Sequence, residues 1–220
     1  MIDPTWAKGI DVSHYKPIQD WDAIPADVVI LGAKVTQGDD FTDPTFTAHR
    51  DGSRARPGRF DLMPYYHVAE PGDPVAHAQR CASIVGPLAP GECLVVDTER
   101  GSRVDLTYVE GVYAEWERLG LATCHDLYYG SAGVWTLMQA RGWPRAAQGK
   151  VALWGPRYKS GGALPHLPPP WSKVTLFQWT DGGATGDPYS CPGVGACDAN
   201  VAVKMDRPAL QAWVAGQPSP

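Results

Sequence analysis

Short apolar runs recur along the whole of this 220-residue chain, and turn-forming residues bound each of them. Most of the runs are continuous rather than alternating, which is typical of parallel strands that are buried on both faces. They therefore predict eight strands. The predicted strands span residues 8–12, 28–35, 62–68, 93–98, 125–130, 151–154, 174–179 and 200–204.

Helix signals lie between several of these runs. Asp43 and Asp73 each precede a proline, which places a capping side chain before a residue suited to the first helical position. Apolar periodicity predicts three further helices, over residues 109–119, 131–141 and 207–214.

Alternation of strands and helices favours a parallel α/β fold, and eight strands favour a closed barrel over an open sheet. About five helices fit between eight strands, so we expect an irregular, TIM-barrel-like (β/α) barrel in which loops make some crossovers. We expect one catalytic domain over residues 1–215 and a flexible tail over residues 216–220.

Charge and composition exclude several classes of protein. The chain has 19 Lys and Arg against 24 Asp and Glu, and the net charge of −5 argues against a nucleic-acid partner. No stretch approaches the roughly 18 consecutive apolar residues of a membrane span. The first eight residues lack the apolar segment of a signal peptide. No His and Cys cluster has the spacing of zinc ligands, so we expect no metal and no cofactor.

The five cysteines fall into two groups. Cys81, Cys93 and Cys124 lie in apolar segments, where we expect them to be buried thiols. Cys191 and Cys197 bracket a short loop that contains Pro and Gly. The sequence does not decide whether this pair forms a disulfide or remains as two free thiols.

Acidic residues collect at the ends of the predicted strands. Asp11 ends the first strand, Asp97 and Glu99 end the fourth, and Asp198 directly precedes the last. The carboxyl ends of the strands carry the active site of a barrel enzyme. Residues two apart in a strand share a face, about 6.6 Å apart along it, so Asp97 and Glu99 are close enough to interact. Paired carboxylates are typical of glycoside hydrolysis; on spacing alone, a structural salt bridge is the alternative.

Seven short motifs resemble, in order, those of the glycoside hydrolase family 25 muramidases, the Chalaropsis-type lysozymes. The second motif departs from the family's usual KATEG, because Val35 and Gln37 replace Ala and Glu. The motifs are KGIDVSHY (residues 8–15), AKVTQG (33–38), PYYH (64–67), VVDTE (95–99), LWGPRY (153–158), FQWT (177–180) and DAN (198–200).

The resemblance implies an irregular β/α barrel that cleaves the β-1,4 bond between N-acetylmuramic acid and N-acetylglucosamine. It implies that Glu99 is the general acid and that Asp97 assists by orienting the N-acetyl group of the substrate. Asp11 and Asp198 complete the acidic cluster. Because like charges raise one another's pKa, we expect Glu99 to hold its proton while Asp97 ionises first.

Residues near the strand ends are candidates for a saccharide groove, because sugar rings stack their C–H faces on aromatic rings. Core packing is the alternative for about half of the aromatic residues, and His67 could bond to substrate or only to structure. The candidates are Tyr65, Tyr66, His67, Tyr129, Trp154, Tyr158, Gln178 and Trp179.

We therefore expect a monomeric peptidoglycan hydrolase that acts on bacterial cell walls. A bacteriophage endolysin is expected, made in the cytoplasm and released through another protein's pore; secretion is the alternative. A non-catalytic peptidoglycan-binding module on the same fold is the alternative function. Such a module would be expected to lose Asp97 or Glu99, and the chain has both.

Overall fold

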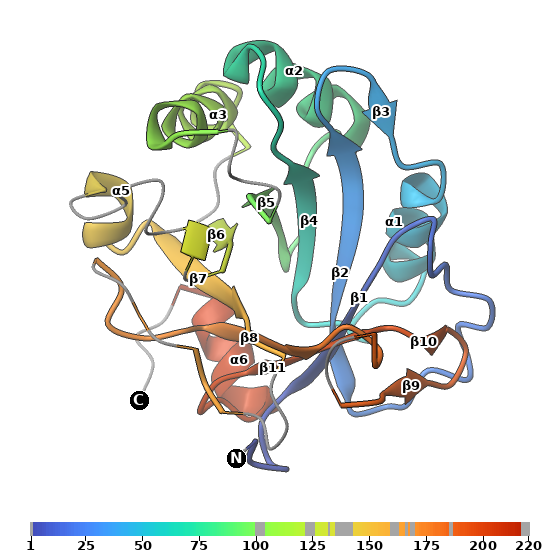
Figure 1. Cartoon of the computed structure of the whole chain (residues 1–220). Helices are drawn as coiled ribbons and strands as arrows, with labels where there is room; N and C mark the ends of the chain where they lie inside the picture. The colour runs from blue at the N-terminus through green and yellow to red at the C-terminus, as the bar shows by residue number, and fades with distance from the viewer. Residues whose placement is uncertain are drawn as a thin grey trace.

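The computed structural model describes residues 2–99, 104–121, 126–131, 133–134, 143–158, 163–165, 167, 170–184 and 187–216. Its centre is a sheet of strand order β1-β11-β8-β7-β6-β5-β4-β2-β3, and pairing of β1 with β2 closes eight of these strands into a barrel (Figure 1). The strands are β1 (Lys8–Val12), β2 (Val28–Gln37), β3 (Phe41–Thr42), β4 (Met63–Val68), β5 (Glu92–Asp97), β6 (Asp126–Tyr129), β7 (Val151–Pro156), β8 (Leu176–Thr180) and β11 (Asp198–Ala202).

The barrel contains all eight predicted strands, and their continuous apolar runs reflect burial on both faces. Every residue of β5 is buried. Val95 belongs to the cluster inside the barrel, which also contains Trp213 of α6 (Arg207–Val214). Leu94 and Val96 belong to a second cluster, which contains Trp116 of α3 (Leu106–Arg118). The strands therefore separate an inner core, to which α6 also contributes, from an outer layer that packs against the other helices.

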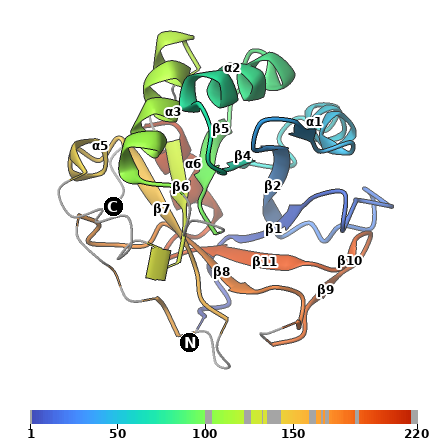
Figure 2. The ribbon, with the colours of Figure 1, turned by 45° about the horizontal axis from the view of Figure 1, so that its top comes forward.

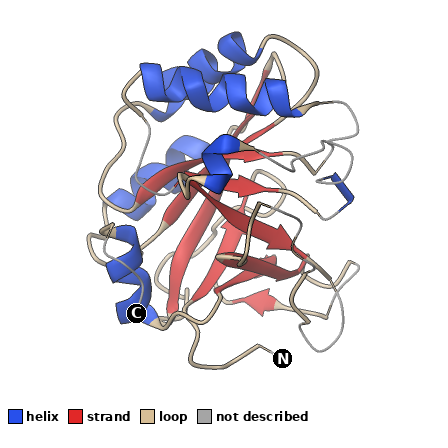
Figure 3. Cartoon of the chain, turned by 90° about the vertical axis from the view of Figure 1, so that its left-hand side faces the viewer, coloured by secondary structure: helices blue, strands red, loops and turns tan. Residues whose placement is uncertain are grey.

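Most of the helices lie on one side of the strands (Figure 3). The start of α2 (Pro74–Val85) is confirmed, because Asp73 accepts a hydrogen bond from the backbone of Val75. The predicted helices at α3 and α6 are also confirmed. The short helix α5 (Pro144–Ala147) was not predicted, and most of the helix expected over residues 131–141 lies outside the described residues. No described helix has the length and apolar character that a membrane span requires.

The predicted start of the first helix is wrong. Helix α1 (Phe46–Arg54) follows Thr45, and Asp43 lies two residues earlier. The Asp43 carboxylate instead accepts hydrogen bonds from Thr45 and from the backbone of His14, 3.0 Å away. It also lies 2.8 Å from the His14 ring nitrogen. Asp43 therefore ties the loop after β1 to the loop after β3.

The predicted parallel direction is wrong for one strand. β11 runs antiparallel to β1 and to β8, between which it lies (Figure 2), while the other pairings of the barrel are parallel. The described part of the chain between β8 and β11 holds a small hairpin, β9 (Ser190–Cys191) and β10 (Gly195–Ala196), rather than a crossover helix. A parallel pair needs such a crossover and an antiparallel pair does not. The first residue of β11, Asp198, consequently lies opposite Asp11 near the end of β1.

The cysteines in the described residues are free thiols. Cys81 and Cys93 are buried, as expected, and Cys124 lies outside the described residues. Cys191 and Cys197 are buried at the β9–β10 hairpin without a disulfide. A hydrogen bond from the Cys197 side chain lowers the pKa of Cys191.

The outer face of β4 is joined to the helices by a chain of hydrogen bonds. The His67 ring lies 2.8 Å from the Thr36 hydroxyl and 2.9 Å from the Tyr108 hydroxyl. The same Tyr108 hydroxyl lies 2.6 Å from the His77 ring, which in turn contacts the Asp39 carboxylate. Burial lowers the pKa of His67 to about 3, and the nearby His77 charge adds to this effect. His67 therefore holds the barrel wall to α2 and α3 as a neutral ring.

This burial of His67 predicts acid-sensitive folding. An unfolded His has a pKa of about 6.5, so between pH 6.5 and about 3 the unfolded chain takes up a proton that the fold resists. The stabilisation is complete above pH 6.5 and is lost as the pH falls towards 3, at a cost on the order of a few kcal/mol. Urea unfolding at pH 7 and pH 4.5 measures this dependence. The His67→Gln variant should show a smaller difference between the two pH values; an unchanged difference would contradict the assignment.

Candidate active site

A polar pocket of about 250 Å³ opens where β1, β5, β6 and β7 end and β11 begins. The structure brings all four acids that the sequence singled out into its lining, together with a fifth that was not predicted, Asp181. The lining residues are Asp11, Tyr66, Asp97, Glu99, Tyr129, Trp154, Tyr158, Gln178, Asp181 and Asp198.

Asp11 is buried at the base of this pocket, and two side-chain amides hold its carboxylate. Gln178 and Asn200 both donate to its Oδ2 atom, at 2.9 Å and 2.7 Å. Burial raises the pKa of Asp11, and the hydrogen bonds from Asn200 and Gln178 oppose the rise. The amides thus stabilise the ionised form of a group that burial would otherwise neutralise.

Asp198 lies opposite Asp11 in the β1–β11 ladder, and the two carboxyl groups share a hydrogen bond. Burial raises the pKa of Asp198 to about 8, and the Asp11 charge adds to the rise. Since the amides of Gln178 and Asn200 favour the charged form of Asp11, we place the shared proton on Asp198. Near neutral pH the pair therefore carries one negative charge and titrates as a unit.

Asp97 and Glu99 meet in the pocket, but not in the way that strand spacing predicts. β5 ends at Asp97, which is buried, whereas Glu99 is exposed on the turn that follows. The Glu99 backbone donates to the Asp97 carboxylate at 2.8 Å. Burial raises the pKa of Asp97 well above its ordinary value, and the Glu99 charge adds to the rise. Burial therefore opposes ionisation of Asp97 in the protein without substrate, and the expectation that Asp97 ionises before Glu99 stays a prediction.

The aromatic residues of the pocket orient its polar groups. The Tyr129 hydroxyl donates to the Gln178 carbonyl oxygen at 2.7 Å, and the Tyr158 hydroxyl contacts the same oxygen. These contacts direct the amide nitrogen of Gln178 towards Asp11. Trp154 likewise donates to the Asn200 side-chain oxygen at 2.8 Å. The tyrosines and the tryptophan thus fix the two amides that hold Asp11.

Three predicted substrate-binding residues lie elsewhere. Tyr65 and His67 project from the outer face of β4, because strand side chains alternate and Tyr66 between them points into the barrel. Tyr65 donates to the buried Glu92 at 2.8 Å. Trp179 is half-buried and packs against Tyr189, with ring centroids 5.6 Å apart. For Tyr65 and His67, which are fully buried, the substrate-binding prediction is therefore corrected to a structural role. For Trp179, which is not among the described lining residues of this pocket, it stays a prediction.

Besides Asp181, sequence reasoning missed two residues that shape the site. Asn200 lies two residues after Asp198, so both face the pocket side of β11, and the DAN motif contained that signal. Gly32 pairs with Asp11 in the parallel ladder. A Cβ atom at Gly32 would lie 2.7 Å from the Asp11 Cβ atom and 3.0 Å from the Trp154 ring. Nothing in the sequence alone marks this close approach.

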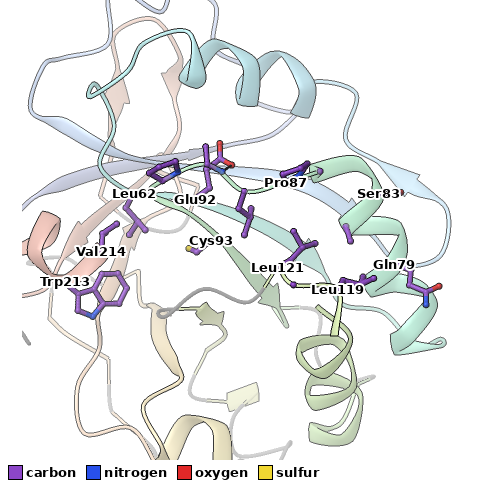
Figure 4. Close-up of a pocket in the computed structure, with 17 residues that line it drawn as sticks. Leu62, Gln79, Ser83, Pro87, Glu92, Cys93, Leu119, Leu121, Trp213 and Val214 are labelled. Atoms are coloured by element: carbon purple, nitrogen blue, oxygen red, sulfur yellow. Dashed lines mark hydrogen bonds between the residues drawn. The ribbon is translucent and has the colours of Figure 1, made fainter. Parts of the chain in front are cut away.

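A larger, apolar hollow of about 870 Å³ lies at the opposite end of the strands, beside the start of β5 (Figure 4). Leu62, Leu121 and Trp213 are among its walls. Among its described lining residues the one acid is Glu92, which is already paired with Arg54 at 2.7 Å. This hollow therefore lacks the carboxyl groups that glycosidic chemistry requires. In the described residues no group of three or more His, Cys, Asp or Glu side chains could hold a metal ion.

Comparison with known proteins identifies the class. The family model for glycosyl hydrolases family 25 matches residues 10–187, and the chain belongs to that family. An N,O-diacetylmuramidase from Chalaropsis sp. is 30% identical over 73 residues, which cover 33% of this chain and 35% of that protein. The match thus spans about a third of the curated relative.

Solved structures share the fold. A bacterial lysozyme from Streptomyces coelicolor superimposes with a TM-score of 0.79 at 21% identity, over 98% of this chain and 100% of that one. A muramidase from Acremonium alcalophilum gives 0.74 at 22% identity, over 96% and 99%. The catalytic domain of endolysin ply40 from bacteriophage P40 of Listeria monocytogenes gives 0.67 at 16% identity, over 98% and 100%. The predicted irregular barrel is confirmed.

The close approach at Gly32 yields a first test of the site. The Gly32→Ala substitution forces Asp11 or Trp154 to move, since real Cβ atoms do not approach within 2.7 Å. We expect at least a tenfold loss of activity, because displacements near 1 Å at a catalytic site can cost about a hundredfold. Initial rates and thermal unfolding of the variant measure both effects. Wild-type activity in a fully folded variant would show that the placement of Asp11 is not critical.

The shared proton predicts an unusual titration. Carbon-13 NMR of labelled Asp carboxyl groups should show a transition near pH 8, because burial and the Asp11 charge disfavour ionisation of Asp198. The transition should vanish in Asp198→Asn. In the control variant Asp181→Asn it should persist at a lower pH, because one neighbouring negative charge is removed. Titration of every Asp below pH 6 would contradict the assignment.

Proposed function

We propose that this chain is a muramidase, which hydrolyses the β-1,4 bond between N-acetylmuramic acid and N-acetylglucosamine in peptidoglycan. The observation that carries the proposal is the pairing of an exposed Glu99 with a buried Asp97 in one acidic pocket of a family 25 chain. The muramidases among its relatives support this substrate class.

In this proposal Glu99 is the general acid. Its carboxyl group is exposed on a turn, where it can reach the oxygen of the bond that breaks. The hydrogen bond from its backbone to Asp97 fixes the turn relative to β5. A proton delivered to the leaving oxygen makes the departing sugar a better leaving group.

Asp97 assists from the buried side. Without substrate, burial favours a proton on this group. Asp97 must therefore release this proton to solvent before the bond breaks, and its carboxylate then faces the positive charge that develops at the anomeric carbon. We infer that Asp97 orients the N-acetyl group and stabilises this charge.

The remaining pocket residues define where the sugar lies. Tyr66 and Tyr158 are half-buried, so part of each ring is open to a ligand, whereas Tyr129 and Trp154 are buried. We propose that Tyr66 and Tyr158 contact sugar faces and that Gln178, Asp11 and Asp198 form the polar floor. We also propose that the protein acts as a monomer, since the acid pair that the mechanism uses lies within a single pocket of the chain.

The central test is Glu99→Gln, which keeps the size of the side chain but removes the acid. General acid catalysis is worth about 10²–10⁴-fold, so we expect a loss of turnover in that range. The assay counts new reducing ends and identifies muramic-acid termini by mass spectrometry, without added metal. Glu117→Gln is the matched control, because Glu117 is exposed on α3 and pairs with Arg145.

Two outcomes would contradict the proposal. Near-normal turnover in a folded Glu99→Gln variant would remove the general acid from the mechanism. Wild-type protein that binds peptidoglycan but releases no new reducing ends would support the alternative, a non-catalytic binding module.

We further propose that the protein lyses bacteria as an endolysin. The catalytic domain of endolysin ply40 supports this role, since it aligns over nearly the whole of both chains. Expression inside a susceptible bacterium tests it. Lysis that begins only after the membrane is permeabilised fits an endolysin, whereas export of active enzyme into the medium contradicts it.

A further inference from the structure

The turn after β1 carries a lysine to the rim of the acidic pocket. The Lys16 backbone donates to the Ser13 carbonyl at 3.0 Å and closes a turn with His14 and Tyr15 at its centre. The Lys16 ammonium lies 4.0 Å from Asp198 Oδ1. It also donates to the backbone carbonyl of Asp181 at 3.1 Å. Lys16 thus links segments from opposite ends of the chain.

Both sides of this contact are shaped to receive the ammonium. On one side, Asp43 fixes the turn through the backbone and ring of His14. On the other side, Gly182 has a φ of +79° and no side chain. A Cβ atom at Gly182 would lie 2.9 Å from the Cys197 backbone nitrogen and 3.0 Å from Lys16 Nζ, so the glycine leaves room for both. The ammonium therefore occupies a prepared position rather than a chance surface contact.

The position matters because the pocket is crowded with acids. Burial raises the pKa of both Asp11 and Asp198, and the Lys16 charge opposes that rise. Lys16 is 34% exposed, so solvent only partly screens its charge. The titratable groups that line the pocket around this ion pair are Asp11, Tyr66, Asp97, Glu99, Tyr129, Tyr158, Asp181 and Asp198.

We propose that Lys16 is a positioning residue of the glycosidase site: its ammonium joins the β1 turn to the loop after β8 and holds Asp181 and Asp198 against the pocket. The role in glycan cleavage rests on the proposed muramidase function. The link between Lys16 and the Asp11–Asp198 pair rests on the contacts alone. Lys16 itself does not touch the reacting atoms.

Variants of Lys16 and of one control lysine separate charge from packing. Lys16→Met removes the charge and the donor but keeps the chain length, and Lys16→Gln is its replacement should it not fold. Lys16→Arg keeps the charge. Lys8→Met is the matched control, because Lys8 pairs with Asp27 at 2.6 Å at the start of β1, away from the pocket.

Carbon-13 NMR of the Asp carboxyl groups is the first readout. Loss of a cation beside Asp198 should raise its titration midpoint by about one pH unit in Lys16→Met. The midpoint should stay near the wild-type value in Lys16→Arg and Lys8→Met. A purely structural role for Lys16 would leave the midpoint unchanged, and that result in a folded Lys16→Met or Lys16→Gln variant would overturn the proposal.

Kinetics on solubilised peptidoglycan is the second readout. We expect kcat/KM to fall about tenfold or more in Lys16→Met, because the loop that carries Asp181 loses its tie, and to recover in Lys16→Arg. Unchanged kcat/KM in Lys16→Met would overturn the role in catalysis. If the wild-type protein cleaves no glycan, the muramidase function fails, and the NMR shift alone then decides whether Lys16 controls Asp198.

Discussion

The buried carboxylate of Asp11 dictates how the mouth of the barrel is built. A charge out of water costs several kcal/mol unless hydrogen bonds replace its solvent, and two amides from β8 and β11 do so here. Those amides are useful only in one orientation. The hydroxyls of Tyr129 and Tyr158 and the indole of Trp154 impose that orientation. Much of the polar network at this edge is therefore a consequence of one acid, and the close approach of β2 at Gly32 is what leaves room for it.

The reversed direction of β11 supplies the second acid of the pair. In an all-parallel barrel the first residue of the last strand would lie at the end remote from the active site. Because β11 runs antiparallel to both of its neighbours, Asp198 lies opposite Asp11 instead. The described part of the connection between β8 and β11 has no crossover helix, and the antiparallel β11 brings Asp198 to Asp11. The shared proton and the contact with Lys16 both depend on this position of Asp198.

The sequence predicts the eight strands and the four acids well, because continuous apolar runs and acids at their ends are local signals. It could not predict the direction of β11, because an apolar run does not show whether the strand pairs parallel or antiparallel to its neighbours. Nor could it decide that Tyr66 faces inwards while Tyr65 and His67 face the helices, because a strand buried on both faces shows no alternation. Glu99 lies on a turn because β5 ends at Asp97, a boundary that the DTE spacing does not mark. The contacts of Lys16 and Gly32 join segments far apart in the chain, so no local pattern contains them.

The turn from Ser13 to Lys16 has a further consequence for how such an enzyme can diverge. Its backbone is fixed by Asp43 on one side and by Lys16 on the other, while Tyr15 between these anchors is 76% exposed. Surface substitutions without buried partners usually change stability by less than about 0.5 kcal/mol. The Tyr15 ring lies 3.9 Å from the His14 ring between centroids. Because Asp43 holds His14 independently of Tyr15, position 15 can exchange one side chain for another without moving the acids nearby. Substitutions at Tyr15 can therefore change which surfaces the turn contacts and leave the acids of the pocket in place.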